Sequence, residues 1–243
     1  MEFSIASQDF AFAFLCGLIP ALFWLWFWLR EDTKNPEPFL LIAITFIAGM
    51  AVVPLALPLQ KLVIDLYDGD NVMFMWVVIE ETLKYAAALL VIFWNRAVDE
   101  PIDFIVYLIA IALGFAALEN ALFVLTPLMN EEYLTVAVTG SFRFLGATLL
   151  HVLASATIGI ALAFAFYRSV TIKLVYSTIG LFIAILLHAL FNFFIIQSSE
   201  QGRENGILLV LLFVWMGIIM VFLLFEKIKL LEAQRKPIIR SNL

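Results

Sequence analysis

The sequence predicts an all-α fold, a polytopic transmembrane helical bundle of about seven spans. The first observation is composition: 64% of the 243 residues are hydrophobic and 14% are charged, whereas a soluble domain carries about 25% charged residues. The second is pattern, because the apolar residues come in long blocks instead of the alternating ten-residue segments of a β-barrel. The third is physical: lipid cannot satisfy an open backbone, so the blocks are expected to be helices.

Seven stretches have the length and hydropathy of a transmembrane helix. Their approximate ranges are 10–29, 39–60, 72–94, 103–127, 143–166, 174–197 and 206–225. The first is predicted to be a retained anchor and not a signal peptide, since it lacks a basic n-region and runs on to Arg30. The connections are short, so residues 1–243 are expected to form one integral membrane domain with its functional core at 72–197.

Basic residues set the expected orientation of the bundle. Most of the basic residues at or beyond the span ends fall on the side that holds the C-terminus, and the smaller group on the other side is Lys61, Arg143 and Arg203. Cytoplasmic loops carry the excess of Lys and Arg. We therefore expect the N-terminus outside and the C-terminus in the cytoplasm.

Charge and cysteine content exclude two classes of function. The net charge of −6 and the lack of a basic run interleaved with aromatic residues argue against a nucleic-acid partner. Cys16 is the single cysteine, so a disulfide framework or a Cys-x-x-Cys metal site is not possible within the chain.

Both histidines of the chain and three glutamates lie inside predicted spans, where ionisable residues are costly and usually functional. These five residues are His151, His188, Glu80, Glu81 and Glu119. With the N-terminus outside, each lies about eight or nine residues below the outer end of its span, which is roughly 12–14 Å at 1.5 Å per residue. The sequence therefore predicts one polar layer, built by four helices in the outer half of the membrane.

Helical spacing predicts which side chains accompany this layer. Lys84 follows Glu80 by four residues and Glu81 by three, so it can pair with either carboxylate. Residues four apart share a helix face. Three further pairs have that spacing: Phe115 with Glu119, His151 with Ser155, and His188 with Asn192.

These groups suit hydrolysis of an amide bond inside a membrane. A carboxylate without a paired ammonium can act as a general base for water, and a nearby imidazole can bind the attacked carbonyl or carry the proton. Asn120 and Asn192 can donate hydrogen bonds to an oxyanion. Ser155 is less favoured as a nucleophile, because a contact with His151 on the same helix is more typical of a local hydrogen bond.

Four ordered motifs resemble a known family. Glu80-Glu81-x-x-Lys84, Phe115-x-x-x-Glu119-Asn120, His151-x-x-x-Ser155 and His188-x-x-x-Asn192 resemble those of the PrsW family of bacterial intramembrane proteases, which is related to the CAAX prenyl endopeptidases. The resemblance covers roughly residues 30–197. It implies a multi-pass protease of a bacterial-type cell membrane that cuts a single-span, anti-sigma-factor-like membrane protein near its extracytoplasmic side.

The resemblance also implies roles for the polar residues. Glu80 or Glu81 would activate water, Glu119 and His151 would complete the polar centre, and His188 with Asn192 would bind the oxyanion, supported by Lys84, Phe115, Asn120 and Ser155. CAAX enzymes place Arg and His where this chain has Lys84 and Glu119, so prenylated substrates are not implied.

The sequence leaves alternatives open both for the use of a cofactor and for the class of function. Metal-free chemistry is favoured because a His-Glu-x-x-His signature is absent; a zinc ion bound by Glu81, Glu119, His151 and His188 is the alternative. The expected partners are a single-span membrane protein and lipid, and the oligomeric state stays open. A proton-coupled transporter and a non-enzymatic scaffold are the competing functions, since buried Glu and His also build proton relays.

Overall fold

The computed structural model describes residues 2–31 and 35–241, and the side chains of residues 8–31, 35–203 and 205–231. Over this range the chain is helical and contains no strand, which confirms the all-α prediction. The elements are α1 (Glu2–Glu31), α2 (Phe39–Leu66), α3 (Asp70–Val91), α4 (Asp103–Met129), α5 (Tyr133–Phe142), the π-helical turn η1 (Arg143–Ala147), α6 (Thr148–Phe164), α7 (Val170–Glu200) and α8 (Glu204–Ser241).

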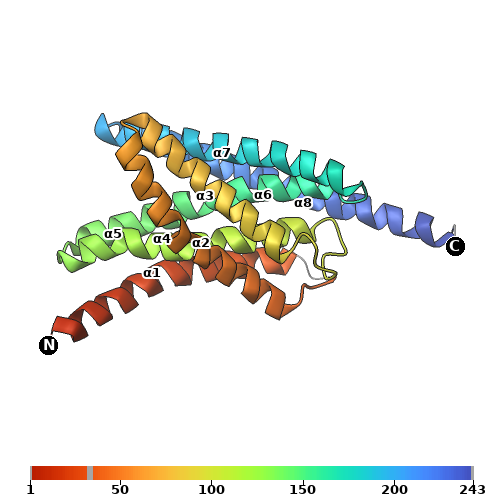
Figure 1. Ribbon diagram of the computed structural model, residues 1–243, viewed down its shortest axis with the longest axis horizontal. Coiled ribbons are helices and arrows are strands. Elements are labelled where there is room, and N and C mark those ends of the chain that lie inside the picture. Colours follow the sequence, from red (N-terminus) through yellow and green to blue (C-terminus); the bar gives the residue numbers. More distant parts are fainter. Residues whose placement is uncertain (1, 32–34, 242–243) are drawn as a thin grey trace.

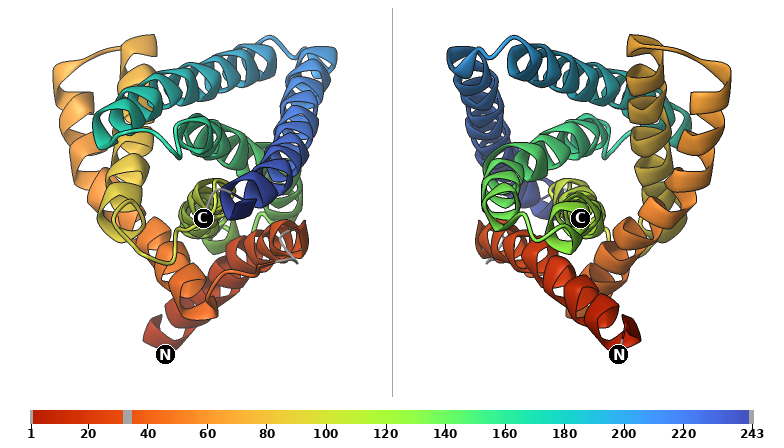
Figure 2. Two further views of the ribbon diagram at one scale, coloured as in Figure 1. Left: turned by 90° about the vertical axis from the view of Figure 1, so that its right-hand side faces the viewer. Right: turned by 90° about the vertical axis from the view of Figure 1, so that its left-hand side faces the viewer.

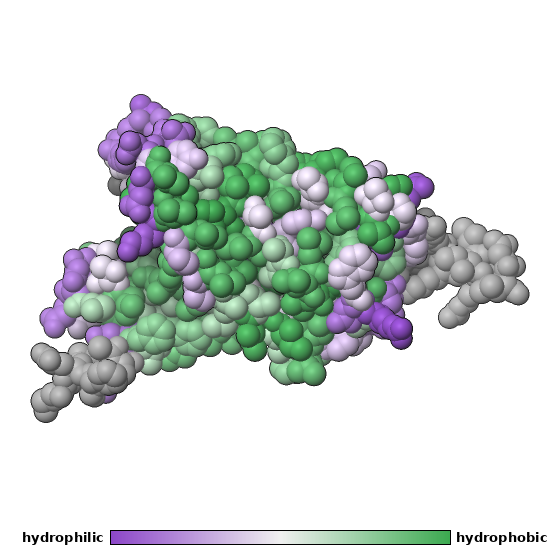
Figure 3. All heavy atoms as spheres, viewed as in Figure 1, coloured by the Kyte–Doolittle hydropathy of each residue, from purple (hydrophilic) through white to green (hydrophobic). Residues whose placement is uncertain are grey.

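The helices have the dimensions of a membrane-spanning bundle. Among the described residues, six helical segments are long and apolar enough to cross a bilayer: 8–31, 39–66, 103–129, 133–164, 170–200 and 205–231. Figure 3 shows apolar surface over the middle of the molecule and hydrophilic residues toward both ends of its long axis. The protein is therefore a multi-pass membrane protein whose helices cross along that axis.

The predicted span 72–94 corresponds to α3, which differs from the others in composition. Its 22 residues reach about 33 Å, enough to cross the hydrocarbon core. It carries three buried charged side chains, Glu80, Glu81 and Lys84, and is not among the six segments that are apolar enough by composition. These charged residues are buried in the bundle, so they make α3 more polar without shortening it.

The connection predicted at about 128–142 is largely helical. α5 continues through η1 into α6, so that residues 133–164 form one candidate span of 32 residues. The helical segment begins ten residues before the predicted boundary at 143, because Arg143 interrupts the apolar run but does not end the helix. Arg143 therefore lies within a candidate span and is not a loop residue of the outer side.

α4 is the central helix of the bundle. Every residue of α4 from Asp103 to Ala117 is buried, and its neighbours are chiefly α1, α2 and α6. Viewed along the long axis, α4 and α6 lie inside a ring formed by the other long helices (Figure 2). A helix that is apolar on all sides can be enclosed in this way.

Glycines permit the closest of these helix contacts. A methyl group added at Gly49 of α2 would meet the backbone of Ile111, and one added at Gly114 of α4 would meet the backbone of Phe46. Small residues at a crossing let two membrane helices pack backbone to backbone. The α2–α4 crossing thereby fixes the position of α2, and through α2 that of α3.

One end of the bundle holds three tight chain reversals, between α2 and α3, α4 and α5, and α7 and α8 (Figure 1). Each includes a residue with positive φ: Gly69 at 59°, Glu131 at 59° and Gly202 at 61°. Two of the three are glycines, which adopt this conformation without a steric penalty. We call this end the α5 end.

A polar cluster lies at the opposite end of α4. The Tyr107 hydroxyl donates a hydrogen bond to Glu37 Oε2, and Asp103 Oδ2 accepts hydrogen bonds from the backbone N–H groups of Asp99 at 2.8 Å and Glu100 at 2.7 Å. We call these five residues the Asp103 cluster. It ties the α1–α2 connection and the turn before α4 to the first turns of α4.

Candidate active site

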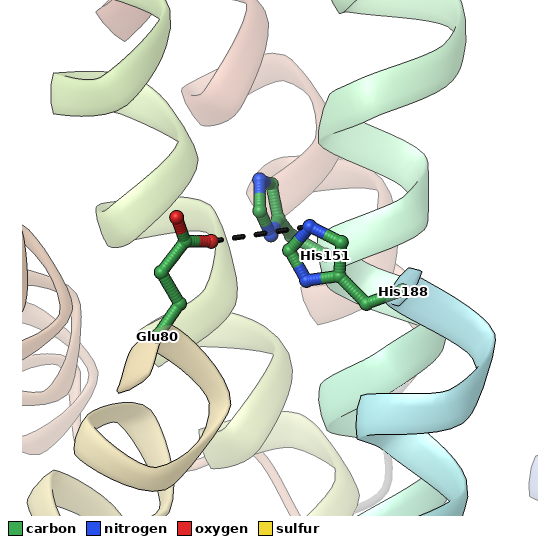
Figure 4. A group of neighbouring side chains, drawn as sticks. All are labelled: Glu80, His151 and His188. Atoms are coloured by element: carbon green, nitrogen blue, oxygen red, sulfur yellow. Dashed lines mark ion pairs between the residues drawn. The ribbon is translucent and has the colours of Figure 1, made fainter. Parts of the chain in front are cut away.

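Four helices bring six ionisable side chains together in what we call the polar layer. α3 contributes Glu80, Glu81 and Lys84, α4 contributes Glu119, α6 contributes His151 and α7 contributes His188. In Figure 4 the carboxylate of Glu80 faces the imidazole rings of His151 and His188. The sequence predicted that these residues share one depth, and the contacts below join them directly.

Glu81 is the carboxylate that joins Lys84 to His188. Its Oε1 accepts hydrogen bonds from Lys84 Nζ at 2.5 Å and from His188 Nδ1 at 2.7 Å, and the side chains of Glu81 and Lys84 are fully buried. Because His188 uses Nδ1 to donate, its Nε2 is left with a free lone pair in the neutral ring. Glu81 thus neutralises Lys84 and orients His188.

Lys84 also determines the tautomer of His151. Lys84 Nζ lies 3.1 Å from His151 Nδ1, and an ammonium group can only donate. His151 Nδ1 is therefore the acceptor, and the ring proton is on Nε2, which lies 3.0 Å from Glu119 Oε2. Phe115 lies next to both Lys84 and His151, with its ring centre 4.7 Å from Lys84 Nζ and 5.0 Å from the His151 ring centre.

Glu80 is the carboxylate that remains available. Its Oε1 accepts a hydrogen bond of 2.8 Å from Gln60 Nε2 of α2. Its Oε2 is buried and has no hydrogen-bond partner among the described residues, and it lies 3.9 Å from His188 Nε2. Sequence spacing allowed Lys84 to pair with either glutamate; in the structure it pairs with Glu81, so Glu80 keeps a free oxygen.

Glu119 is held by a residue that the sequence analysis placed elsewhere. Arg143 of η1 donates through Nη2 to Glu119 Oε2 and through Nε to Asn120 Oδ1, the latter at 2.5 Å. Asn120 Nδ2 in turn donates to Thr148 Oγ1 at 2.8 Å. Asn120 therefore uses both ends of its amide to support Arg143.

Two other predicted site residues, Ser155 and Asn192, are not hydrogen-bonded to the polar layer. Ser155 is buried, and its Oγ has no hydrogen-bond partner among the described residues, so the expected local bond to His151 is not formed. Asn192, one turn after His188 on α7, is half-buried, and no described residue is hydrogen-bonded to its side-chain amide. Of the two asparagines, Asn192 is the one whose donors are available.

Comparison with known proteins identifies the family. Residues 37–224 match the family described as PrsW family intramembrane metalloprotease. The chain belongs to the PrsW family. Membership favours an intramembrane protease over the transporter and scaffold alternatives.

Individual relatives agree with this family. Protease PrsW of Oceanobacillus iheyensis is 26% identical over 181 residues, which covers 73% of this chain and 80% of that protein. Protease PrsW of Bacillus subtilis is 24% identical over 188 residues, covering 76% and 83%, and that of Clostridioides difficile is 26% identical over 189 residues, covering 74% and 77%. No solved structure matches the chain.

The family description raises the question of a metal ion. In the part of the chain with described side chains, the group that could hold one is Glu80, His151 and His188, whose ligand atoms lie within 4.8 Å of one another. This differs from the set predicted for the zinc alternative, because Glu81 and Glu119 are instead bonded to Lys84 and Arg143. Two histidines and a glutamate are a known donor set for catalytic zinc.

The arrangement around His151 does not fit a cation as it stands. Both of its ring nitrogens are already used, Nδ1 by the ammonium group of Lys84 and Nε2 by Glu119. A metal ion would have to displace Lys84 and would then lie beside a second positive charge. Glu80 and His188 each have an atom free to bind a metal ion, but these two ligands alone do not form a site of two histidines and a glutamate.

The sequence reasoning missed Gln60 and Arg143. Gln60 is uncharged and lies on the second predicted span, so neither charge nor motif spacing points to it. Arg143 was visible as a charge, and its separation from His151 by eight residues, about two helical turns, is the signal that could have linked them.

Proposed function

We propose that this PrsW-family chain hydrolyses a peptide bond of a membrane-embedded protein substrate with water activated by Glu80. The observation that carries the proposal is the unpartnered Glu80 Oε2, which faces His188 Nε2 at 3.9 Å. A water molecule between these two atoms can reach both at hydrogen-bonding distance. Glu81 also has a buried Oε2 without a described partner, but its Oε1 is shared by Lys84 and His188 and its charge is already paired with an ammonium group, which is not so for Glu80.

The contacts within the polar layer suggest a separate chemical role for each of its residues. Glu80 takes a proton from the attacking water while the lone pair of His188 Nε2 orients it, so that the water oxygen bonds to the carbonyl carbon. The C–N bond then breaks, and the proton held by Glu80 passes to the leaving amine. Glu81 keeps His188 in the required tautomer through its Nδ1–H bond.

Asn192 is the proposed donor to the oxyanion. Its amide is four residues after His188 on the same helix and has no described partner. A positioned amide of this kind typically contributes about 10²–10³ in kcat. Asn120 is left out of this role because its amide is engaged by Arg143 and Thr148.

The proposed substrate is a single-span, anti-sigma-factor-like protein, cut near the outer face of a bacterial-type cell membrane. The basic residues support an outer position for the α5 end. Glu80 and Glu119 are ten residues from the α5 end of their helices, which is about 15 Å. The side chains of Arg143 and Glu119 are 15% and 16% exposed, whereas those of Lys84 and Glu81 are fully buried, so access from the α5 end is favoured.

The test is cleavage of a single-span substrate in proteoliposomes by the wild type, Glu80→Gln and Glu131→Gln. Glu131 is exposed in the turn before α5, so its variant is a matched control for loss of one carboxylate. We expect Glu80→Gln to cleave about 10²–10⁴-fold more slowly and Glu131→Gln to cleave at the wild-type rate. Equal rates for all three would overturn the site, and no cleavage by the wild type across candidate single-span substrates would overturn the function.

Metal-dependent hydrolysis is the second candidate. The clustering of Glu80, His151 and His188 ligand atoms within 4.8 Å favours it. A bound zinc ion would supply acidification of a water molecule and polarisation of the carbonyl. Glu80 and His188 would hold it, and His151 would join them only after Lys84 had moved away from its Nδ1, with Glu81 and Glu119 orienting the two histidines. Cleavage by metal-free protein in a chelating buffer supports the first proposal, whereas activity that is lost on chelation and restored by one equivalent of zinc supports the second.

A further inference from the structure

Arg143 makes three contacts at the edge of the polar layer. Its guanidinium donates to Glu119 Oε2 and to Asn120 Oδ1, and its central carbon lies 3.8 Å from the ring centre of Phe123. Glu119, Asn120 and Phe123 are all on α4. One side chain from the helix of His151 is therefore fixed to three positions on the facing helix.

The π-helical turn η1 is what directs Arg143 toward Glu119. In a regular α-helix, residues eight apart such as Arg143 and His151 are about 80° apart around the axis. A π turn accommodates one extra residue, and this reduces the separation to about 20°. Arg143 and His151 consequently reach the same oxygen, Glu119 Oε2.

The geometry points to Arg143 as a positioning residue: it holds the Glu119 carboxylate against His151 and thereby fixes the His151 ring in the layer. Without Arg143, Glu119 would be a largely buried carboxylate without its cation, which is costly. Its 16% exposed side chain could then turn toward the α5 end. His151 Nε2–H would lose its acceptor, while Lys84 would still hold Nδ1.

The effect on His151 can be measured without any substrate. The chain contains two histidines, so ¹⁵N-histidine labelling of the full-length protein in lipid gives two imidazole spin systems, assigned with a His188→Asn variant. In the wild type we expect the ring proton on Nε2 for His151 and on Nδ1 for His188. Arg143→Gln should shift or split the His151 Nε2 signal and leave the His188 signals in place.

The kinetic consequence rests on the proposed function. A displacement of about 1 Å in a catalytic group costs up to about 10²-fold, so Arg143→Gln should lower kcat roughly 10- to 100-fold with little change in KM. Arg143→Lys keeps the charge but cannot bond both Glu119 and Asn120 as a fork. Its kcat should therefore lie between those of the wild type and Arg143→Gln. Lys61→Gln, which removes an exposed charge from the same end of the bundle, should have no effect.

A double-mutant cycle separates positioning from a general loss of structure. If Arg143 acts through Glu119, then Arg143→Gln causes no further loss in a Glu119→Gln background, which is strong non-additivity. Multiplicative losses in the cycle, a rise in KM at constant kcat, or an unchanged His151 signal in Arg143→Gln would each overturn the inference. If no substrate is cleaved by the wild type, the proposed function fails, but the labelled-histidine spectra still decide the role of Arg143.

Discussion

The polar layer and the Asp103 cluster hold buried carboxylates on the same helix by different means. Asp103 and Glu119 are sixteen residues apart on α4, about 24 Å along its axis. The bonds to Asp103 Oδ2 come from backbone N–H groups three and four residues away. Those of the layer come from side chains on other helices, at separations of 32 for Glu119 with His151 and 107 for Glu81 with His188.

This difference separates a structural carboxylate from a functional one. Backbone N–H groups of the turn before α4 donate to the Asp103 carboxylate much as in an ordinary helix cap, and these bonds need nothing but the local turn. The layer instead pairs Glu81 with Lys84 and Glu119 with Arg143, and leaves Glu80 without a cation. A carboxylate left free beside two neutralised ones is hard to explain as a structural feature.

The largest expected effect separates the two regions by activity. Glu80→Gln should slow cleavage by about 10²–10⁴-fold because it removes the general base, whereas Asp103→Asn should leave the cleavage rate within about twofold, since it keeps an acceptor oxygen for the turn. The measurement is initial cleavage rate in proteoliposomes. Equal losses from both substitutions would erase the distinction drawn here.

The next effect concerns stability within the layer. Lys84→Met leaves the buried Glu81 without its ammonium partner, and breaking such a pair costs about 3–5 kcal/mol. Adding Glu81→Gln should recover much of this loss, because no charge is then left unpaired. Unfolding free energies in mixed micelles would check both variants, and a double variant as unstable as Lys84→Met alone would contradict the pairing.

A smaller effect is expected at the Asp103 cluster. Tyr107→Phe removes the hydroxyl that donates to Glu37 and should lower the unfolding free energy by about 0.5–1.5 kcal/mol. Cleavage activity of the folded variant should be unchanged. A folded Tyr107→Phe protein with impaired cleavage would mean that the two ends of α4 are coupled.

The smallest effect is a pH dependence at Glu37, which lies in the α1–α2 connection. Burial raises the pKa of the Glu37 carboxyl from its ordinary value. A raised pKa in the folded state means that folding favours the protonated form, so this contribution is present below the ordinary pKa and is lost as pH rises through the folded pKa. Unfolding measured from pH 4 upward should show a steeper decline in the wild type than in Glu37→Gln.

Much of the layer could be predicted from the sequence because charge inside an apolar span is a strong signal. The free-energy cost of an ionisable group in lipid alone singles out Glu80, Glu81, Glu119, His151 and His188. The rise of the helix then places them at one depth. The choice between Glu80 and Glu81 as partner of Lys84 depends on the rotation of α3 about its axis. Adjacent helical residues differ by about 100°, and only packing against α2 and α7 sets that angle.

Arg143 shows why other parts could not be predicted. A hydropathy window treats a charge as the end of a span, yet a guanidinium that meets a carboxylate inside the bundle can lie within one. The π turn that directs it toward Glu119 has no sequence signature in this chain, because its residues, Arg-Phe-Leu-Gly-Ala, are also common in α-helices. Whether a metal ion can bind likewise depends on where the Lys84 ammonium group lies, and the spacing of residues in the sequence does not fix that position.

The most direct test of the central claim is the single-turnover cleavage rate of a single-span substrate by metal-free protein in a chelating buffer. It should compare the wild type with Glu80→Gln. We expect cleavage by the wild type under these conditions and a rate lower by about 10²–10⁴-fold for Glu80→Gln. A wild type that is inactive until zinc is returned, or a Glu80→Gln protein that cleaves at the wild-type rate, would contradict the central claim.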